Sequence, residues 1–367
     1  MNTALLYTKA VALLKQLIAI PSFSREEQGT ARLLQNWLMR EGINVHRKGN
    51  NVIAFSKHFN KSKQTVLLNS HHDTVRPATG YSHDPFVPFE EDSKLFGLGS
   101  NDAGGCLVSL AVTFLYFNDQ DLPFNLVFAA TAEEEVSGAN GIASVLPVLG
   151  KIDCAIVGEP TGMNMAVAER GLMVLDVVSS GISGHAARSD GDNALYKAMK
   201  DIEWFGKYRF GKTSDLLGPV SMQVTVIETE NKAHNVIPDH CRFVVDVRLN
   251  ECYSPEEVLE VIRNNVQALV TPRSTRLRSS IIPSDHQLVL AGEALGWTSF
   301  GSPTLSDKAL MPFPALKIGP GNSARSHVAD EFIFLEEIRQ GVEGYVNLLQ
   351  QLGKQIQMNH YENLAKT

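Results

Sequence analysis

The sequence predicts an α/β fold: a mixed, mostly parallel sheet flanked by helices, with a smaller α+β part inserted into it. The chain has 367 residues, which is too long for one ordinary core, so two domains are expected. Short apolar strands alternate with helices up to about residue 168, and the alternation resumes at about residue 285. Between these segments, alternating strands mixed with helices predict an insertion with one antiparallel sheet.

Composition and charge favour small-molecule chemistry. Hydrophobic residues make up 44% and charged residues 20%, as in ordinary globular proteins. The net charge of −7 argues against a nucleic-acid groove or a membrane-surface patch. The apolar segment 5–18 is interrupted by Lys9 and Lys15 and predicts an amphipathic helix, not a signal peptide, and no apolar run is long enough to span a bilayer.

The cysteines indicate a reducing compartment. They show no C-x-x-C pairing and lie in apolar surroundings, which is typical of small buried hydrophobic residues. A cytoplasmic location is therefore expected. The four positions are Cys106, Cys154, Cys241 and Cys252.

In the first part of the chain, Ser24–Glu27 has the form of a capping box and predicts the start of a helix that ends at Gly42. A glycine-rich loop at 96–105 leads into an apolar helix from about Leu107 to Phe117. Because no Gly-Lys-Ser/Thr closes this loop, it is not a phosphate-binding P-loop. Its glycines are expected to let the backbone crowd a site and to aim Asp102 inward, although Asp102 could instead cap the helix.

Polar residues follow three of the predicted strands. His71 and Asp73 follow the first strand and lie two positions apart, so in an extended chain they project to the same side. Glu133–Glu135 follow the second strand and Glu159 follows the third. Adjacent acids repel one another unless cations or solvent lie beside them, and strand ends are where α/β sheets build their sites. The repetition favours a metal site over three solvated turns.

The later segments are less informative by themselves. The Gly-His stretch at His185 and the Asn-x-x-Pro stretch at Asn235 could each be a simple turn. Ser254–Glu257 predicts a well-capped helix start. His327 follows a Gly-Pro-Gly loop and precedes a closing helix from about 335 to 352, a placement that suits a rigidly held ligand. The polar tail, 355–367, is expected to be poorly ordered.

This inventory of histidines and carboxylates, with no thiolate among them, suits Zn²⁺, Co²⁺ or Mn²⁺. The absence of H-E-x-x-H disfavours a single-zinc protease built on one helix. A dinuclear centre needs one carboxylate that bridges the ions and another that stays off them to accept a proton from water. The adjacent residues Glu134 and Glu135 could supply the base and a ligand.

An ordered set of motifs resembles the dinuclear-zinc amidohydrolases, a family that includes acetylornithine deacetylase, succinyl-diaminopimelate desuccinylase and carboxypeptidase G. The motifs are S-H-x-D-T-V, G-x-G-x-x-D-x-G-G, T-A-E-E-E, G-E-P-T, S-G-x-S-G-H-A, N-V-I-P, and G-P-G followed by S-H-x-x-D-E. The resemblance runs from about Ile18 to Gly353. It implies a homodimer in which a catalytic domain, 1–168 and 282–367, is split by an inserted dimerisation (lid) domain, 169–281.

The resemblance also implies a centre with two zinc ions per subunit, which Co²⁺ could replace. One ion would be held by His71 and Glu159, the other by Glu135 and His327, and Asp102 would bridge them. Asp73 would orient His71. Glu134 would be the general base and later the acid toward the leaving amine.

Further roles fall in the insertion and beside it. The resemblance implies that His185 reaches the active site of the partner subunit and stabilises the oxyanion. Asn235 and Arg248 match positions near the substrate carboxylate, and Arg170 and Thr304 are further matches. For the last four residues, turn or strand-edge hydrogen bonds are an equally good explanation.

These features predict a cytoplasmic enzyme in which a hydroxide held by two zinc ions hydrolyses the amide of a small N-acyl amino acid, without a nucleic-acid or membrane partner. N-acetylornithine, in arginine biosynthesis, is the expected substrate. The D-A-G-G form at Asp102, with Ala103 where many members have Lys, resembles the branch that uses N-acetylcitrulline or N-succinylornithine. The alternatives are a dipeptidase or carboxypeptidase, a succinyl-diaminopimelate desuccinylase, and a binding protein without metal, which the complete ligand set disfavours.

Overall fold

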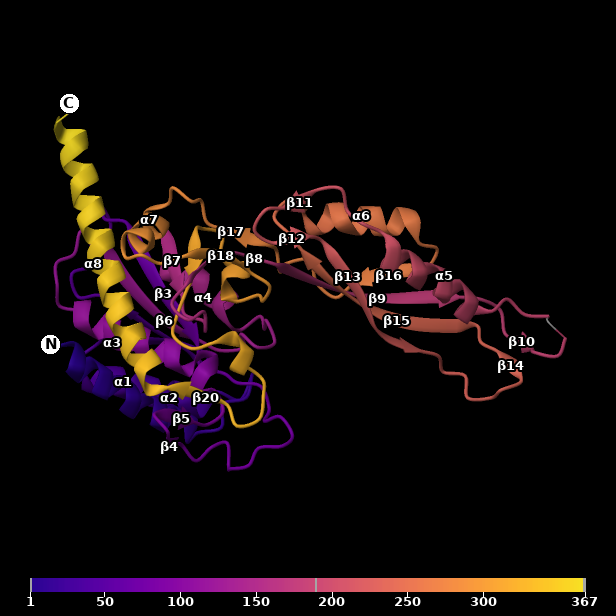
Figure 1. The fold of residues 1–367 in the computed structure, drawn as a ribbon, viewed down its shortest axis with the longest axis horizontal. Helices are drawn as coiled ribbons and strands as arrows, with labels where there is room; N and C mark the ends of the chain where they lie inside the picture. The colour runs from indigo at the N-terminus through magenta and orange to yellow at the C-terminus, as the bar shows by residue number, and fades with distance from the viewer. Residues whose placement is uncertain (1, 189, 366–367) are drawn as a thin grey trace. The chain divides into compact units, whose positions relative to one another are not determined.

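The chain folds into two compact units, which Figure 1 shows as a ribbon. The structure is a computed structural model, and it describes residues 2–188 and 190–365. The first unit comprises Met1–Val167, Ile282–Phe300 and Ser306–Thr367. The second unit comprises Ala168–Ile281 and Gly301–Leu305.

The first unit is built on a mixed sheet in the order β1-β2-β6-β3-β7-β19-β8-β17, with β18 also paired to β8. Strands β6, β3, β7 and β19 run parallel, whereas β1, β2 and β8 are antiparallel to their neighbours. The mostly parallel sheet is therefore confirmed. The strands are β1 (Val45–Lys48), β2 (Asn51–Phe55), β3 (Thr65–His71), β6 (Asn125–Thr131), β7 (Cys154–Val157), β8 (Met165–Glu169), β17 (Ser280–Ile281), β18 (Ser299–Ser302) and β19 (Ala315–Lys317).

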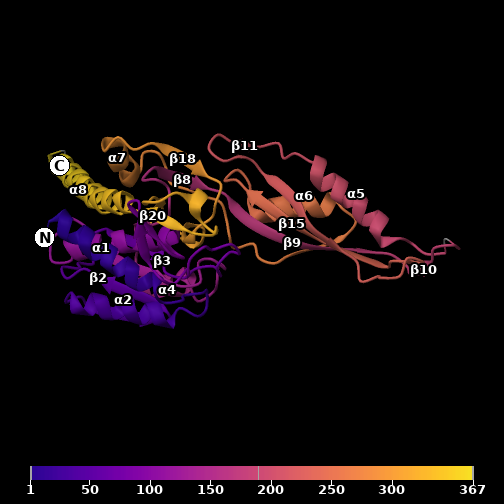
Figure 2. The ribbon, with the colours of Figure 1, turned by 60° about the horizontal axis from the view of Figure 1, so that its bottom comes forward.

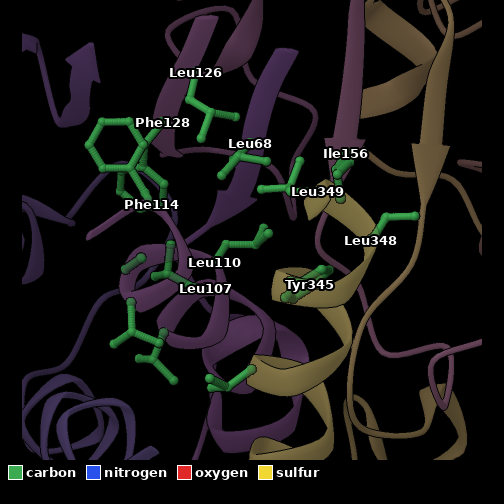
Figure 3. Packing of buried hydrophobic residues seen from close by; sticks show 14 of the residues in the cluster. Leu68, Leu107, Leu110, Phe114, Leu126, Phe128, Ile156, Tyr345, Leu348 and Leu349 are labelled. Carbon is green, nitrogen blue, oxygen red and sulfur yellow. The ribbon is translucent and has the colours of Figure 1, made fainter. Parts of the chain in front are cut away.

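Helices cover both faces of this sheet, so the central strands bury every side chain, as expected of parallel strands. On one face, Figure 3 shows Leu68, Phe128 and Ile156 packed against Leu110 of α3 and Tyr345 of α8. On the other face, a smaller cluster packs the sheet against α4. The helices of this unit are α1 (Thr3–Ile18), α2 (Gln28–Arg40), α3 (Gly105–Phe117), α4 (Ile142–Leu149), α7 (Gln287–Ala294) and α8 (Leu335–Ala365).

Smaller elements carry the loops of the site. A short antiparallel sheet joins β4 (Phe89–Glu91), β5 (Lys94–Phe96) and β20 (Phe332–Phe334). A short π-helical turn, η1 (Ser100–Gly104), whose backbone is non-helical at Asp102 and Ala103, follows β5 and runs directly into α3. Two 3-10 turns, η2 (Asp307–Leu310) and η3 (Ser323–Arg325), lie in the C-terminal part.

The second unit is the predicted α+β part with one main antiparallel sheet, β13-β15-β9-β16. Alternate residues of β9 are buried, and Figure 2 shows α5 and α6 over one face of the sheet. The capping box at Ser254 is confirmed. The elements are β9 (Gly171–Ser180), β10 (Gly184–His185), α5 (Ala194–Lys207), β11 (Thr213–Ser214), β12 (Gly218–Pro219), β13 (Ser221–Glu228), β14 (Val236–Ile237), β15 (His240–Leu249), α6 (Pro255–Asn265) and β16 (Leu269–Pro272).

Three local expectations are wrong. The segment Ser24–Glu27 forms no capping box: α2 begins at Gln28, and its N-cap, Glu27, makes no side-chain capping bond. The tail is not irregular, because α8 continues to Ala365; residues 366 and 367 lie outside the described chain. All four cysteines are free thiols, but Cys252 is partly exposed while the other three are buried.

None of the helices in residues 2–188 and 190–365 combines the length and the apolar character that crossing a bilayer would need.

Candidate metal centre

The site lies where neighbouring parallel strands end. In the sheet, His71 at the end of β3 pairs with Thr131 at the end of β6, and Asn69 pairs with Val157 at the end of β7. Because the carboxyl ends of parallel strands meet at one edge, the residues just beyond them converge. This edge therefore gathers the predicted residues that follow each strand.

Two histidines flank the carboxylate of Asp102. Oδ1 of Asp102 lies 3.3 Å from Nε2 of His71, and Oδ2 lies 3.7 Å from Nε2 of His327. On the first side, Oε1 of Glu159 lies 3.8 Å from Nε2 of His71. On the second side, Oε2 of Glu135 lies 3.0 Å from Nε2 of His327. The five predicted ligands thus form two half-sites that share one carboxylate.

The residues present fit a divalent cation. Ligand atoms of His71, Asp102 and Glu135 lie within 4.8 Å of one another, and so do those of His71, Glu134 and Glu159. Oε1 of Glu159 is buried and has no hydrogen-bond partner within the described chain. A buried carboxylate oxygen without a partner is costly unless a cation compensates it. Nitrogen and oxygen donors without sulfur suit Zn²⁺, Co²⁺ or Mn²⁺.

The pKa values of these side chains show that the cluster lacks positive charge. Burial, helped by repulsion from Asp102 and Glu135, raises the pKa of Glu159 to about 8. Burial also raises the pKa of Glu134 well above its ordinary value. The hydrogen bond to Glu135 raises the pKa of His327 to about 9. Without a metal ion the cluster therefore takes up protons, and a divalent cation would supply the same charge.

Asp73 contacts both His71 and the turn that carries Glu134 and Glu135. Nδ1 of His71 donates to the backbone carbonyl oxygen of Asp73 at 2.9 Å, whereas the Asp73 carboxylate lies further away, at 3.5 Å. With a proton held on Nδ1, the neutral ring would offer the lone pair of Nε2 to an ion in the site. The carboxylate of Asp73 instead accepts the backbone N–H groups of Glu134 and Glu135 at 3.1 and 3.2 Å.

The three consecutive glutamates differ in what they contact. The side chain of Glu133 accepts hydrogen bonds from the backbone N–H and the amide of Asn140, so it faces away from the site. Glu135 contacts His327. Glu134 lies beside His71 and Glu159, and within the described chain no group donates a hydrogen bond to its carboxylate. Only Glu134 and Glu135 therefore face the cluster.

His72, between His71 and Asp73 in the chain, takes no part in the cluster. It is buried, and its ring nitrogens contact Oγ1 of Thr30 at 2.9 Å and the carbonyl oxygen of Asn50 at 3.0 Å. Burial lowers the pKa of His72 to about 4, so the ring is neutral at physiological pH.

The sequence analysis missed several residues that shape the site. Ser24 donates from Oγ to the Asp73 carboxylate at 2.7 Å. Asp307 is buried and accepts from Oγ1 of Thr131 at 2.7 Å, and burial raises the pKa of Asp307 to about 6. Glu331 accepts three backbone hydrogen bonds from the Asp102 loop. The D-E pair after His327 was a possible signal for Glu331; no local pattern pointed to the other two.

The remaining predicted residues lie in the second unit. The segments of His185 and Asn235 lie side by side, because the carbonyl oxygen of Asn235 accepts the N–H of Ala186 at 3.0 Å. Nε of Arg248 donates to Asp246 at 2.7 Å. The role of these residues at the metal centre stays a prediction.

Two weaker matches make local contacts within the second unit. The guanidinium of Arg170 donates to the carbonyl oxygen of Leu217 and to Oγ of Ser221. The hydroxyl of Thr304 lies 3.1 Å from that of Ser302. These contacts fit the structural alternative that the sequence left open for both residues.

Comparison with known proteins gives consistent matches. A sequence model of peptidase family M20/M25/M40 matches residues 67–351. A succinyl-diaminopimelate desuccinylase from Paracoccus denitrificans is 27% identical over 270 residues, covering 69% of this chain and 71% of the relative. An acetylornithine deacetylase from Proteus mirabilis is 27% identical over 373 residues, covering 90% of this chain and 94% of the relative.

Solved structures share the fold. A tripeptidase from Staphylococcus aureus superposes with a TM-score of 0.77 at 17% identity, covering 95% of this chain and 99% of that one. A Bacillus subtilis protein described as a dinuclear metal-binding peptidase superposes with a TM-score of 0.71 at 16% identity, covering 96% of this chain and 99% of the other.

Proposed function

The chain belongs to peptidase family M20/M25/M40 and is a metal-dependent amide hydrolase, and within that class we propose that it removes the acyl group from an N-acyl amino acid. The observation that carries the proposal is the position of Asp102, whose two carboxylate oxygens lie 3.3 and 3.7 Å from the Nε2 atoms of two different histidines. A carboxylate whose two oxygens face two different histidines can bridge a pair of metal ions.

We propose two Zn²⁺ ions per subunit, with Co²⁺ as a substitute. His71 and Glu159 would hold one ion, Glu135 and His327 the other, and Asp102 would contact both. The dinuclear description of the Bacillus subtilis protein, which has the same fold, supports this assignment. When bound, such ions polarise the amide carbonyl and lower the pKa of the attacking water.

The remaining chemistry belongs to Glu134. Its backbone N–H is held by the carboxylate of Asp73, while its own carboxylate stays available to a water molecule. It would accept the proton of the water as the C–O bond forms, and it would pass that proton to the nitrogen as the C–N bond breaks. The products are then the free amino acid and a short carboxylic acid.

Substrate contacts from the second unit complete the proposal. His185 of the partner subunit would donate to the developing oxyanion, which requires a homodimer. Arg248 and Asn235 would bind the substrate carboxylate, and Arg248 would then exchange its ion pair with Asp246 for the substrate. The hydrogen bonds of Arg170 and Thr304 favour structural roles for these two residues.

Two groups of substrates fit the relatives. The acetylornithine deacetylase supports N-acetylornithine, or the related N-acetylcitrulline and N-succinylornithine, in arginine biosynthesis. The succinyl-diaminopimelate desuccinylase supports N-succinyl-diaminopimelate at the same 27% identity. All of these are small amides with a free α-carboxylate, so one active site could be adapted to either group. A cytoplasmic location is part of the same proposal.

The test is a substrate panel assayed on enzyme that a chelator has stripped. It contains the four N-acyl compounds named above and several dipeptides, each with and without added Zn²⁺ or Co²⁺. We expect the metal to restore release of one free amino acid from one N-acyl compound. Faster hydrolysis of a dipeptide would identify a peptidase instead. Two bound ions without turnover of any compound would overturn the proposed substrate class.

A further inference from the structure

A buried carboxylate lies against the loop that carries Asp102. The side chain of Glu331 is 2% exposed and accepts three backbone hydrogen bonds from this loop. Oε2 accepts from the N–H of Gly99 at 2.9 Å, and Oε1 accepts from the N–H groups of Asn101 and Asp102 at 2.8 and 2.9 Å. Consecutive backbone N–H groups that converge on one anion fix the local path of the chain.

The same residue belongs to the segment that carries His327. Glu331 lies four residues after His327 and immediately before β20, whose Phe332 pairs with Phe96 of β5. Its backbone carbonyl also accepts the N–H of Gly97 at 3.0 Å. Glu331 therefore connects the loop of Asp102 to the loop of His327 through both its side chain and its backbone.

We propose that Glu331 is a positioning residue for the metal centre. By holding the N–H of Asp102, it sets where the two oxygens of that carboxylate lie between His71 and His327. The inference rests on the proposed role of Asp102 as the shared ligand. Losing a group that orients a metal ligand lowers metal affinity by roughly 10–100-fold in other proteins.

The chemistry of the contact explains why a carboxylate is needed. An ionised carboxylate is an acceptor only, so both of its oxygens can face N–H donors. In Glu331→Gln one position becomes an NH₂ group. Whichever way the amide turns, this NH₂ faces either Gly99 or the pair Asn101 and Asp102. At least one backbone N–H then loses its acceptor, and the loop must move to relieve the contact.

Asp201 provides a matched control. It is a buried carboxylate, 5% exposed, in the second unit, and it accepts the backbone N–H groups of Gln267 and Ala268 at 3.1 and 3.0 Å. Asp201→Asn makes the same chemical change in a similar environment, but none of its contacts involves a predicted metal ligand. Both variants should lose stability, and only one should lose metal affinity.

The experiment is a Co²⁺ titration of chelator-stripped wild type, Glu331→Gln and Asp201→Asn. Binding is measured by equilibrium dialysis and by the visible absorption of bound Co²⁺. Thermal unfolding of the stripped proteins accompanies it. We expect Glu331→Gln to bind Co²⁺ roughly 10–100-fold more weakly, with an altered spectrum. Asp201→Asn should bind as wild type does. If Glu331→Gln does not fold, Glu331→Asp keeps the charge on a shorter side chain and should show a smaller loss.

The outcomes separate this inference from the proposed function. Wild-type Co²⁺ affinity and spectrum in a folded Glu331 variant would overturn the positioning role while leaving the metal centre intact. An equal loss in Asp201→Asn would also overturn it, because general loosening would then explain the effect. A wild-type protein that binds no Co²⁺ would overturn the metal centre together with this inference.

Discussion

At the scale of single residues, Glu134 and Glu135 are adjacent in the chain and have different surroundings. Oε2 of Glu135 lies 3.0 Å from Nε2 of His327. Glu134 lies on the other side of the cluster, near His71 and Glu159. A turn that holds both backbone N–H groups on the Asp73 carboxylate directs the two side chains to the two half-sites. Adjacent residues of the same type can therefore serve as ligand and base.

We expect Glu134→Ala to lower kcat by roughly 10²–10⁴-fold, because it removes the proton acceptor and no metal ligand. Metal content, measured by atomic emission on dialysed protein, should stay at the wild-type value. Glu135→Ala is the matched comparison and should lose metal as well as activity. Wild-type kcat in Glu134→Ala would disprove its role as base, and loss of metal would make it a ligand instead.

At the scale of elements, the turn η1 places Asp102 by close backbone contacts. A Cβ added at Gly104 would lie 2.3 Å from the carbonyl oxygen of Gly99, which cannot move without moving the loop. A Cβ at Gly105 would meet the end of the Ile333 side chain, also at 2.3 Å, where a flexible group could yield. The glycine at 104 is therefore required by the close approach of two backbone segments.

Gly104→Ala should therefore destabilise the protein by about 1–3 kcal/mol and weaken metal binding, since the overlap displaces the chain next to Asp102. Urea unfolding and Co²⁺ titration would measure the two effects. The control is Gly206→Ala in α5, where nothing lies within 4 Å of the added Cβ. That variant should gain about 0.5–1 kcal/mol from helix propensity. Equal stability of the two variants would contradict the steric argument.

The elements also show which features local sequence could predict. Strand ends were predictable because buried runs such as 125–130 end sharply in charged residues. The capping box at Ser24 failed because its hydroxyl has a distant partner, Asp73, and Glu27 accepts the N–H groups of Arg25 and Glu133 instead. A local sequence pattern cannot reveal a competing hydrogen-bond partner that folding brings from a distant part of the chain.

The same limit applies to the site. Ligands at strand ends could be proposed from one rule about parallel sheets, applied to His71, Glu135 and Glu159. The contact between Glu331 and Asn101 joins residues 230 positions apart, and the contact between Asp307 and Thr131 joins residues 176 apart. The D-E pair after His327 marks Glu331 but not its partner, and no local pattern marks Asp307, so only the folded structure shows these contacts.

At the scale of the whole molecule, the metal-free protein should lose stability as pH rises from about 6.5 to about 9. Up to about pH 8, folded Glu159, with its pKa raised by burial to about 8, keeps a proton that the unfolded chain has released. Folded His327, with a pKa raised to about 9 by Glu135, does the same. Because the folded state binds more protons, unfolding becomes easier as pH rises. The pKa of His72 is lowered to about 4, so this residue makes stability depend on pH only below this range.

Thermal unfolding at several pH values, with and without Zn²⁺, measures this effect. The melting temperature of the stripped protein should fall across the range. Bound metal should reverse the trend, because ligation requires ionised carboxylates and neutral imidazoles, and their protons leave more easily at high pH. If the melting temperature of the stripped protein rises between these pH values, the inference that the metal-free cluster lacks positive charge is contradicted.

Assembly is the last property that the proposed mechanism requires of the molecule. His185 lies in the second unit, on β10, while the ligands and Glu134 lie in the first. If the partner's His185 completes each active site, His185→Ala and Glu134→Ala should each be nearly inactive as pure dimers. A mixed dimer has one site that contains both Glu134 and a partner's His185, so it should regain up to about half the wild-type activity per dimer.

The mixed dimers are made by co-expressing the two variants with different affinity tags and purifying on both tags in turn. Size-exclusion chromatography should first show that His185→Ala has the same assembly state as wild type. Mixing two Glu134→Ala chains with different tags is the control and should restore nothing. A monomeric wild type, or a mixed dimer as inactive as its parents, would overturn the composite site, and an inactive His185→Ala variant would then point to a role within its own subunit. Wild-type kcat in His185→Ala would place His185 outside the reaction, and the oxyanion would then need another donor.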